Sequence, residues 1–296
     1  MTRTTNPAGL LDRLKHLQRT RFPNIPPNTM LLLYAQQGLL GRLGASPYAE
    51  QFVLKGALSL FARYGNAARP TQDIDLAGRG LSNTPGQIRT VLEDLCTFSF
   101  GDGLIFDPAS IQASPINEAS DYPGVTAKLR ATLGPSQVTL QLDFSFGNVI
   151  TPAPVHLDFP PLLLDQAVRV ASYPLETVIT EKFAALVEIG EATTRMKDLY
   201  DLQIILSTES FEANTVHQAL ARSFAARGRP IDHVQAIFSD VFASEPVLAA
   251  RWGQYLRRNG FSAPAFTEVM GLLRVFYAPL LLGGRTEGTW TQGTWR

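Results

Sequence analysis

The sequence predicts a mixed α/β protein with a small helical element at its N-terminus, a core containing strands and a mostly helical C-terminal half. Two segments, Val125 to Leu133 and Val138 to Phe146, alternate apolar and polar residues with the period of two that is typical of strands. Apolar residues toward both ends of the chain recur instead at helical spacing. We therefore predict an N-terminal helical element at 1–47, an α/β core at 48–172, a helical domain at 173–282 and a tail at 283–296.

The period of the apolar residues changes several times before residue 80. Leu10, Leu14 and Leu17 share one helical face, and Pro26-Pro27 ends that pattern. The elements expected next are a helix at Met30–Leu43, a strand at Phe52–Leu54, a turn at Lys55-Gly56, a helix at Ala57–Tyr64 and a strand at Gln72–Ala77.

The two alternating segments form a predicted hairpin, because Gly134-Pro135 lies between them. A further strand is expected at Val168–Ala171, and prolines between 150 and 165 indicate a connector to the helical part. The helices expected there are Thr177–Glu188, Arg195–Leu206 and Thr215–Ala226.

The tail repeats the sequence Gly-Thr-Trp at Trp290 and Trp295 and lacks a core pattern. We expect a loosely packed segment or an edge strand.

Composition excludes several classes of protein. Basic and acidic residues balance at 26 each, so charge does not mark the whole chain as a nucleic-acid binder. The single cysteine, Cys96, excludes an intrachain disulfide and suits a reducing cytoplasm. None of the four histidines lies within metal-ligand spacing of another, which argues against structural zinc. No apolar run is long enough to cross a membrane, so we expect a cytoplasmic protein without a membrane partner.

Two carboxylates on one predicted strand indicate a metal site. Asp73 and Asp75 point to the same face, while Ile74 faces the core. Neighbouring carboxylates repel unless a cation lies between them, and Mg²⁺ commonly combines one or two carboxylates with substrate phosphates. Asp143, on the polar face of a later strand, is the predicted third ligand of a two-metal Mg²⁺ site, with Mn²⁺ as an alternative ion. Asp-x-Asp alone is also common at solvated strand edges, so the context decides.

That context is a glycine at a predicted helix start. Gly56 lets phosphate oxygens approach backbone N–H groups at the positive end of the helix. The following loop, which contains Arg69, returns the chain so that the Asp pair can lie beside that helix start. Arg69 either binds a triphosphate or pairs with one of the two aspartates.

The order of strand, glycine turn, helix, loop and Asp-hydrophobic-Asp strand resembles the nucleotidyltransferase superfamily pattern. More specifically, the chain resembles the AbiEii/AbiGii toxin family, which includes the MenT-type toxins, from about residue 10 to beyond residue 206. The motifs that carry this resemblance are Phe52-Val-Leu-Lys-Gly-Ala, Arg69 to Leu76, Leu142-Asp-Phe-Ser-Phe-Gly, Glu181-Lys182-Phe and Arg195-Met-Lys-Asp-Leu-Tyr-Asp-Leu202. The chain departs from the pattern at Ala57, where a second glycine or a serine is usual, and this change puts nucleotide affinity or selectivity in question.

The resemblance implies a polymerase-β-like nucleotidyltransferase core, with the active site in a cleft between core and C-terminal helices. It implies metal binding by Asp73 and Asp75 and roles in activity for Lys182 and Asp198. The residues expected to contact the nucleotide are Lys55, Gly56, Ala57, Arg69, Lys182 and Arg195. The implied reaction transfers a nucleoside monophosphate from a nucleoside triphosphate to the 3′ end of tRNA, as the toxin of a pair with a cognate antitoxin. Asp143 is then a candidate general base for the acceptor hydroxyl.

Other interpretations stay open. Lys182 also fits a lysine that covers an apolar helix face, and Arg195, Asp198 and Asp201 also fit intrahelical salt bridges, with or without Asp198 orienting Lys182. The acceptor is alternatively a protein or small-molecule hydroxyl, and the chain is alternatively a non-catalytic nucleotide-binding module.

Two basic residues share a strand face without a neighbouring acid in the sequence pattern. Lys128 and Arg130 either neutralise a polynucleotide backbone or belong to a solvated sheet face.

Overall fold

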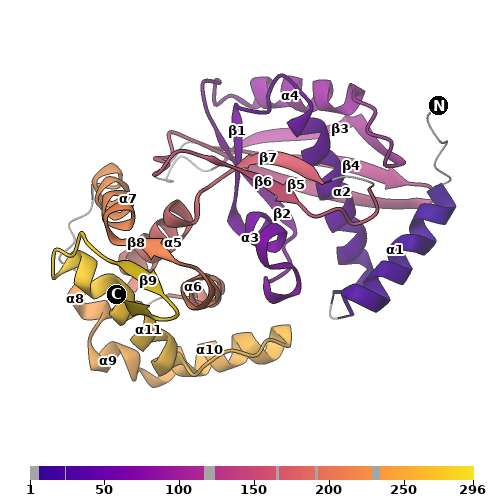
Figure 1. The fold of residues 1–296 in the computed structure, drawn as a ribbon. Coiled ribbons are helices and arrows are strands. Elements are labelled where there is room, and N and C mark those ends of the chain that lie inside the picture. Colours follow the sequence, from indigo (N-terminus) through magenta and orange to yellow (C-terminus); the bar gives the residue numbers. More distant parts are fainter. Residues whose placement is uncertain (1–6, 24, 117–123, 165–166, 191–192, 229–233) are drawn as a thin grey trace. The chain divides into compact units, whose positions relative to one another are not determined.

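The computed structural model describes residues 7–23, 25–116, 124–164, 167–190, 193–228 and 234–296 (Figure 1). The chain divides into two compact units. Unit 1 comprises Met1–Asn148 and Pro154–Tyr173, and unit 2 comprises Val149–Ala153 and Pro174–Arg296. The combination of a mixed sheet with helices confirms the predicted α/β class.

In the described part of unit 1, seven strands form one mixed sheet in the order β3-β4-β5-β2-β1-β7-β6 (Figure 1). The strands are β1 (Phe52–Lys55), β2 (Asp73–Gly78), β3 (Leu104–Ile116), β4 (Gly124–Leu133), β5 (Ser136–Phe146), β6 (Val155–Phe159) and β7 (Val168–Ser172). β2 pairs antiparallel with β1 and parallel with β5, so it lies at the centre of the sheet. The predicted hairpin is confirmed, because β4 and β5 pair antiparallel along their whole lengths.

Two helices cover the apolar face of the central strands. They are α2 (Pro27–Gly44) and α4 (Pro85–Thr97). Side chains from both helices meet Ile74 of β2 and Leu142 of β5 around a void of only about 10 Å³, so this core is tightly filled. Because side chains alternate along a strand, the residues that flank Ile74 and Leu142 face the opposite side of the sheet.

A buried ion pair joins α2 to the loop before β3. The guanidinium of Arg42 donates to the two oxygens of Asp102 at 2.6 and 3.1 Å, and both side chains are at most 4% exposed. Arg42 also donates to the backbone carbonyls of Gly38, Phe98 and Leu104. These bonds fix the end of α4 and the start of β3 against α2.

The other helical segments of unit 1 are α1 (Pro7–Arg21), α3 (Gly56–Tyr64) and the short 3₁₀ turn η1 (Gly65–Ala67). α3 begins directly where β1 ends, as the Lys55-Gly56 turn predicted. Phe61 of α3 packs its ring against those of Phe22 and Phe159.

Unit 2 is mostly helical, as predicted. Its helices are α5 (Leu175–Ile189), α6 (Met196–Thr208), α7 (Ala213–Ala226), α8 (Val234–Ile237), α9 (Asp240–Ala243), α10 (Pro246–Asn259) and α11 (Phe266–Leu281). Phe183 of α5 stacks on Tyr277 of α11 with ring centroids 3.8 Å apart, and the Tyr277 hydroxyl donates to the carbonyl of Ile179. The stacked rings tie the first helix of the unit to the last.

The expectation of a loosely packed tail was wrong. Trp290 is fully buried, its indole N–H donates to the carbonyl of Leu206 at 2.7 Å, and its ring meets that of Phe276. It lies on β9 (Thr289–Thr291), between β8 (Phe211–Glu212) and β10 (Thr294–Trp295) in a small sheet. Through Trp290 the tail belongs to the core of unit 2, where β9 pairs with the distant β8. The alternative expectation of an edge strand holds for β10, which pairs only with β9 in this sheet.

The predicted connector between 150 and 165 contains a strand that was not expected, because β6 pairs antiparallel with β7. Residues 154–173 belong to unit 1, and residues 149–153 belong to unit 2. The sequence patterns also missed β3, which contains two prolines and a register shift between Asp107 and Gln112. Among the described residues, no helix has the length and apolar character needed to cross a bilayer.

Candidate active site

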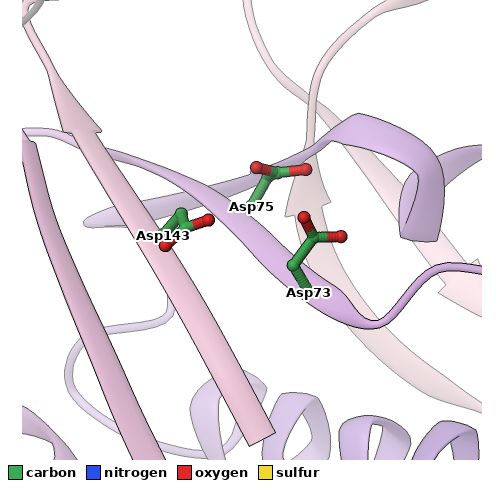
Figure 2. Close-up of side chains that lie close together, drawn as sticks. All are labelled: Asp73, Asp75 and Asp143. Atoms are coloured by element: carbon green, nitrogen blue, oxygen red, sulfur yellow. The ribbon is translucent and has the colours of Figure 1, made fainter. Parts of the chain in front are cut away.

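Three aspartates converge on the polar face of the central sheet. Asp73 and Asp75 lie on β2, and Asp143 lies directly opposite Asp75 on the parallel strand β5. One carboxylate oxygen from each lies within 4.8 Å of the others, and Figure 2 shows the three side chains projecting on the same side of the two strands. All three are half-buried. Three such charges repel one another unless a cation lies between them, so this donor set fits a hard divalent ion.

Neighbouring polar side chains hold two of these carboxylates. The Thr71 hydroxyl donates to Asp73. The Thr126 hydroxyl donates to one oxygen of Asp143 at 2.7 Å, and the Gln141 amide donates to the other at 3.3 Å. The sequence patterns did not indicate these partners. The hairpin register could have indicated Thr126, because directly opposed residues on paired strands share a face.

The glycine at the start of α3 lies against the aspartates, as expected. Gly56 has a φ of +66°, and a Cβ atom there would lie 1.9 Å from Oδ2 of Asp75. Lys55 is the cross-strand partner of Asp75, so a cation borders the acidic group on the β1 side. The first backbone N–H groups of α3 follow immediately and can receive an anion.

The other two predicted nucleotide contacts of unit 1 differ in their surroundings. The side chain of Ala57, in the first turn of α3, is buried. Arg69 is half-buried in the segment between η1 and β2 that leads to Asp73. Its predicted contact with a triphosphate stays a prediction.

Unit 2 contains a compact charged cluster at Lys182. The Lys182 ammonium on α5 donates to Asp198 and Asp201 of α6, at 2.7 Å each, and is only 11% exposed. Arg195 donates to the second oxygen of Asp198 at 2.5 Å. The helical salt bridge and the orientation of Lys182 by Asp198 are therefore both present.

These cations set the ionisation of Asp198. Burial acts to raise the pKa of Asp198, but Lys182 and Arg195 outweigh burial, so the pKa lies below the ordinary value of 3.8. Asp198 is therefore ionised at neutral pH. The sequence pattern placed Asp201 on the helix face of Arg195 and Asp198 without a role of its own. The structure identifies Asp201 as the second partner of Lys182.

A polar pocket of about 500 Å³ lies beside the aspartates on the same sheet face. Lys128 and Arg130 line it, together with Gln141, the residue that donates to Asp143. The expectation that these cations have no acidic neighbour was wrong for Arg130, which lies 3.8 Å from Asp107 on the adjacent strand β3.

A central sheet with an Asp-x-Asp strand, a third carboxylate on its parallel neighbour and a glycine-started helix beside them is the arrangement expected of a nucleotidyltransferase. The family described as "Nucleotidyl transferase AbiEii toxin, Type IV TA system" matches residues 38–272. The chain belongs to this family, which confirms the resemblance drawn from its motifs. It is therefore a nucleotidyltransferase of toxin–antitoxin type, with a nucleotide substrate and an antitoxin partner implied by the family.

One solved structure supports the same fold. The chain is similar to a protein from H. pylori assigned as a nucleotidyltransferase, with 16% identity and a TM-score of 0.51 over 88% of this chain and 97% of that one. It is also similar to JHP933 from Helicobacter pylori, with 14% identity and a TM-score of 0.49 over 88% of this chain and 94% of that one. Among curated proteins, none matches the chain.

Proposed function

We propose that the chain transfers a nucleoside monophosphate from a nucleoside triphosphate to the hydroxyl at the 3′ end of tRNA, in a reaction that depends on Mg²⁺. The convergence of Asp73, Asp75 and Asp143 carries this proposal, because these three carboxylates would hold the metal ions. Mg²⁺ bound there supplies Lewis-acid stabilisation of charge on the α-phosphate and on the leaving pyrophosphate, and Mn²⁺ offers the same chemistry.

The residues around the metal ligands bind the nucleotide and move the proton. Lys55 and the backbone N–H groups that begin at Gly56 bind triphosphate oxygens. The acceptor oxygen forms a bond to the α-phosphorus while the bond from that phosphorus to the pyrophosphate oxygen breaks. Asp143 takes the proton of the acceptor hydroxyl, and Thr126 and Gln141 keep its carboxylate in position.

The charged cluster of unit 2 supplies further cations in this proposal. The resemblance assigns Lys182 and Arg195 to stabilising negative charge on the triphosphate, and it assigns Arg69 to nucleotide binding. Asp198 holds both unit 2 cations by direct hydrogen bonds, which favours a fixed arrangement of charge before the nucleotide binds.

The proposed acceptor rests on the resemblance in motifs. The family is one of nucleotidyl transferase toxins, and nucleotides added to the 3′ end of tRNA would block aminoacylation, which suits a toxin. We place the reaction in the cytoplasm, where the single thiol of Cys96 stays reduced.

Incorporation of each labelled nucleoside triphosphate into total tRNA tests the proposal. We compare the native protein with Asp73→Asn, using Asp158→Asn on the edge strand β6 as a control for the same substitution away from the site. Loss of a metal ligand removes several kcal/mol of transition-state stabilisation, so Asp73→Asn should label tRNA at least about 100-fold more slowly. The control should match the native rate, and EDTA should stop the reaction until excess Mg²⁺ is added.

The outcomes separate the acceptors. Full activity of Asp73→Asn would remove the metal assignment. Release of pyrophosphate and labelling of protein without labelling of tRNA would replace the tRNA acceptor by a protein hydroxyl.

A further inference from the structure

The polar pocket and the aspartates belong to one cross-strand row. Gln112 on β3 is paired with Lys128 on β4, Lys128 with Gln141 on β5, and Gln141 with Asp73 on β2. Directly opposed residues on paired strands share a face, so the pocket continues the same surface that carries the metal ligands.

The pocket and the glycine turn lie on opposite sides of the aspartates. Across the sheet, the order is the pocket on β3, β4 and β5, then the acids on β5 and β2, then Lys55 on β1 and the start of α3. In phosphoryl transfer, the attacking and leaving oxygens lie roughly in line on opposite sides of the phosphorus. If the pyrophosphate of a bound triphosphate points toward Gly56, the acceptor must therefore approach the phosphorus from the side of the pocket.

We infer that this pocket binds the sugar-phosphate backbone of a polynucleotide acceptor, next to its reactive 3′ end. The inference rests on the proposed function and assigns an acceptor subsite to Lys128, Arg130 and the side-chain amides beside them. Lys128 and Arg130 are two residues apart on β4, so their side chains project from one face about 6–7 Å apart along the strand. Two cations in this arrangement suit successive phosphates of a single strand.

The remaining lining supports RNA over a protein acceptor. Gln72, Ser110, Gln112 and Thr139 add neutral donors and acceptors, which match ribose hydroxyls and base edges, and Leu32 of α2 adds one apolar side chain. A protein hydroxyl presents no comparable run of negative charge for the two cations to neutralise.

The acid beside Arg130 does not block phosphate binding. Its partner Asp107 lies 3.8 Å away, and the two side chains are 47% and 39% exposed. Ion pairs this exposed contribute little because solvent screens them, so a phosphate can compete for the guanidinium. Gln141 lines the pocket and also donates to Asp143. A strand bound in the pocket would therefore lie next to a side chain that contacts the proposed base.

The test removes the two positive charges and measures the binding of RNA and the KM for the nucleotide separately. The double variant Lys128→Gln/Arg130→Gln is compared with Arg169→Gln/Arg222→Gln, which loses the same charge from exposed positions on β7 and α7. Fluorescein-labelled total tRNA is titrated by anisotropy over a series of salt concentrations without nucleotide. The KM values for tRNA and for the nucleoside triphosphate are then measured in the labelling reaction.

The pocket variant should bind tRNA about tenfold more weakly at low salt, and the slope of log affinity against log salt should flatten by about 1.4 for two lost phosphate contacts. Its KM for tRNA should rise in proportion, while its KM for the triphosphate stays within about twofold of the native value. The control variant should match the native protein. Lys128→Arg, which keeps the charge, should retain native affinity.

Three results would overturn the inference: unchanged tRNA affinity and salt slope in the pocket variant, equal losses in the control, or a raised KM for the triphosphate alone. Equal melting temperatures of the variants exclude misfolding as the cause of a loss. Because the anisotropy titration contains no nucleotide, it tests the pocket even if tRNA is never labelled. A native protein that binds tRNA through the pocket but labels another acceptor would remove the proposed reaction and keep the subsite.

Discussion

Replacing Gly56 by alanine should remove most transferase activity while leaving unit 1 folded. A Cβ atom at this position would lie 1.9 Å from Oδ2 of Asp75, whereas ordinary Cβ contacts begin near 3.4 Å. The carboxylate or the start of α3 must therefore move by about 1.5 Å. Misplacement of reacting groups by about 1 Å costs on the order of 100-fold in rate, which corresponds to about 2.7 kcal/mol.

A second glycine separates this clash from backbone strain. Gly80 has a φ of +67°, nearly the same as the +66° of Gly56, but no atom lies within 4 Å of its Cβ position. Both alanine variants place a side chain in a left-handed conformation at a cost of about 1–2 kcal/mol, so both should show a similar small loss of stability. Only Gly56→Ala should also displace Asp75.

The assay combines labelling rates with thermal unfolding. Gly56→Ala should label the acceptor about 100-fold more slowly than Gly80→Ala at similar melting temperatures. Equal rates in the two variants would refute the close approach of Gly56 to Asp75. A much lower melting temperature for Gly56→Ala alone would refute the claim that the carboxylate yields before the fold does.

Three further predictions concern stability and reactivity. Asp102→Asn should lower the free energy of unfolding by about 3–5 kcal/mol in urea denaturation, because it leaves the buried charge of Arg42 without its partner; a loss under about 1 kcal/mol would contradict this. Burial raises the pKa of Cys96 from 9.0 to about 11, so its thiolate fraction in mildly alkaline buffer should be about 100-fold below that of the unfolded chain. The rate of alkylation by iodoacetamide measures this fraction, and equal rates in the folded and unfolded states would contradict the prediction. The lowered pKa of Asp198 contributes stability that is present above 3.8 and lost as the pH falls through the lower folded-state value, so Asp198→Asn should flatten the acid decline of unfolding free energy; parallel declines would contradict this.

The pair of aspartates on β2 could be predicted from sequence because the relevant signals are local. Asp73 and Asp75 lie two residues apart on a short strand, and strand periodicity alone places them on one face. The glycine before α3 and the clean alternation of β5 placed Gly56 and Asp143 in the same way. The approach of Asp143 to Asp75 depends instead on the parallel pairing of β2 with β5, and the sequence does not specify strand register between such distant segments.

The missed strands show a related limit. β3 and β6 lie at the two edges of the large sheet. β3 contains two prolines and a shift in register, which an edge strand tolerates, so its sequence lacks the regular alternation of β4 and β5. β6 does alternate, but it has only five residues and lies among the prolines that indicated a connector. Trp290 was misread for another reason, since its burial depends on β8 and α11 as well as on the neighbouring β10, and the sequence of the tail does not show the two distant elements.

The parallel pairing of β2 with β5 brings the three aspartates together from distant parts of the chain. The exposed turn at Gly134 and Pro135 lies between them, so a chain broken there would carry Asp73 and Asp75 on one fragment and Asp143 on the other. Neither fragment would hold all three carboxylates, so each alone should lack transferase activity. Exposed turns are the sites at which chains tolerate such breaks best. Reassociation of the two fragments should therefore restore transferase activity, and this activity would measure their association.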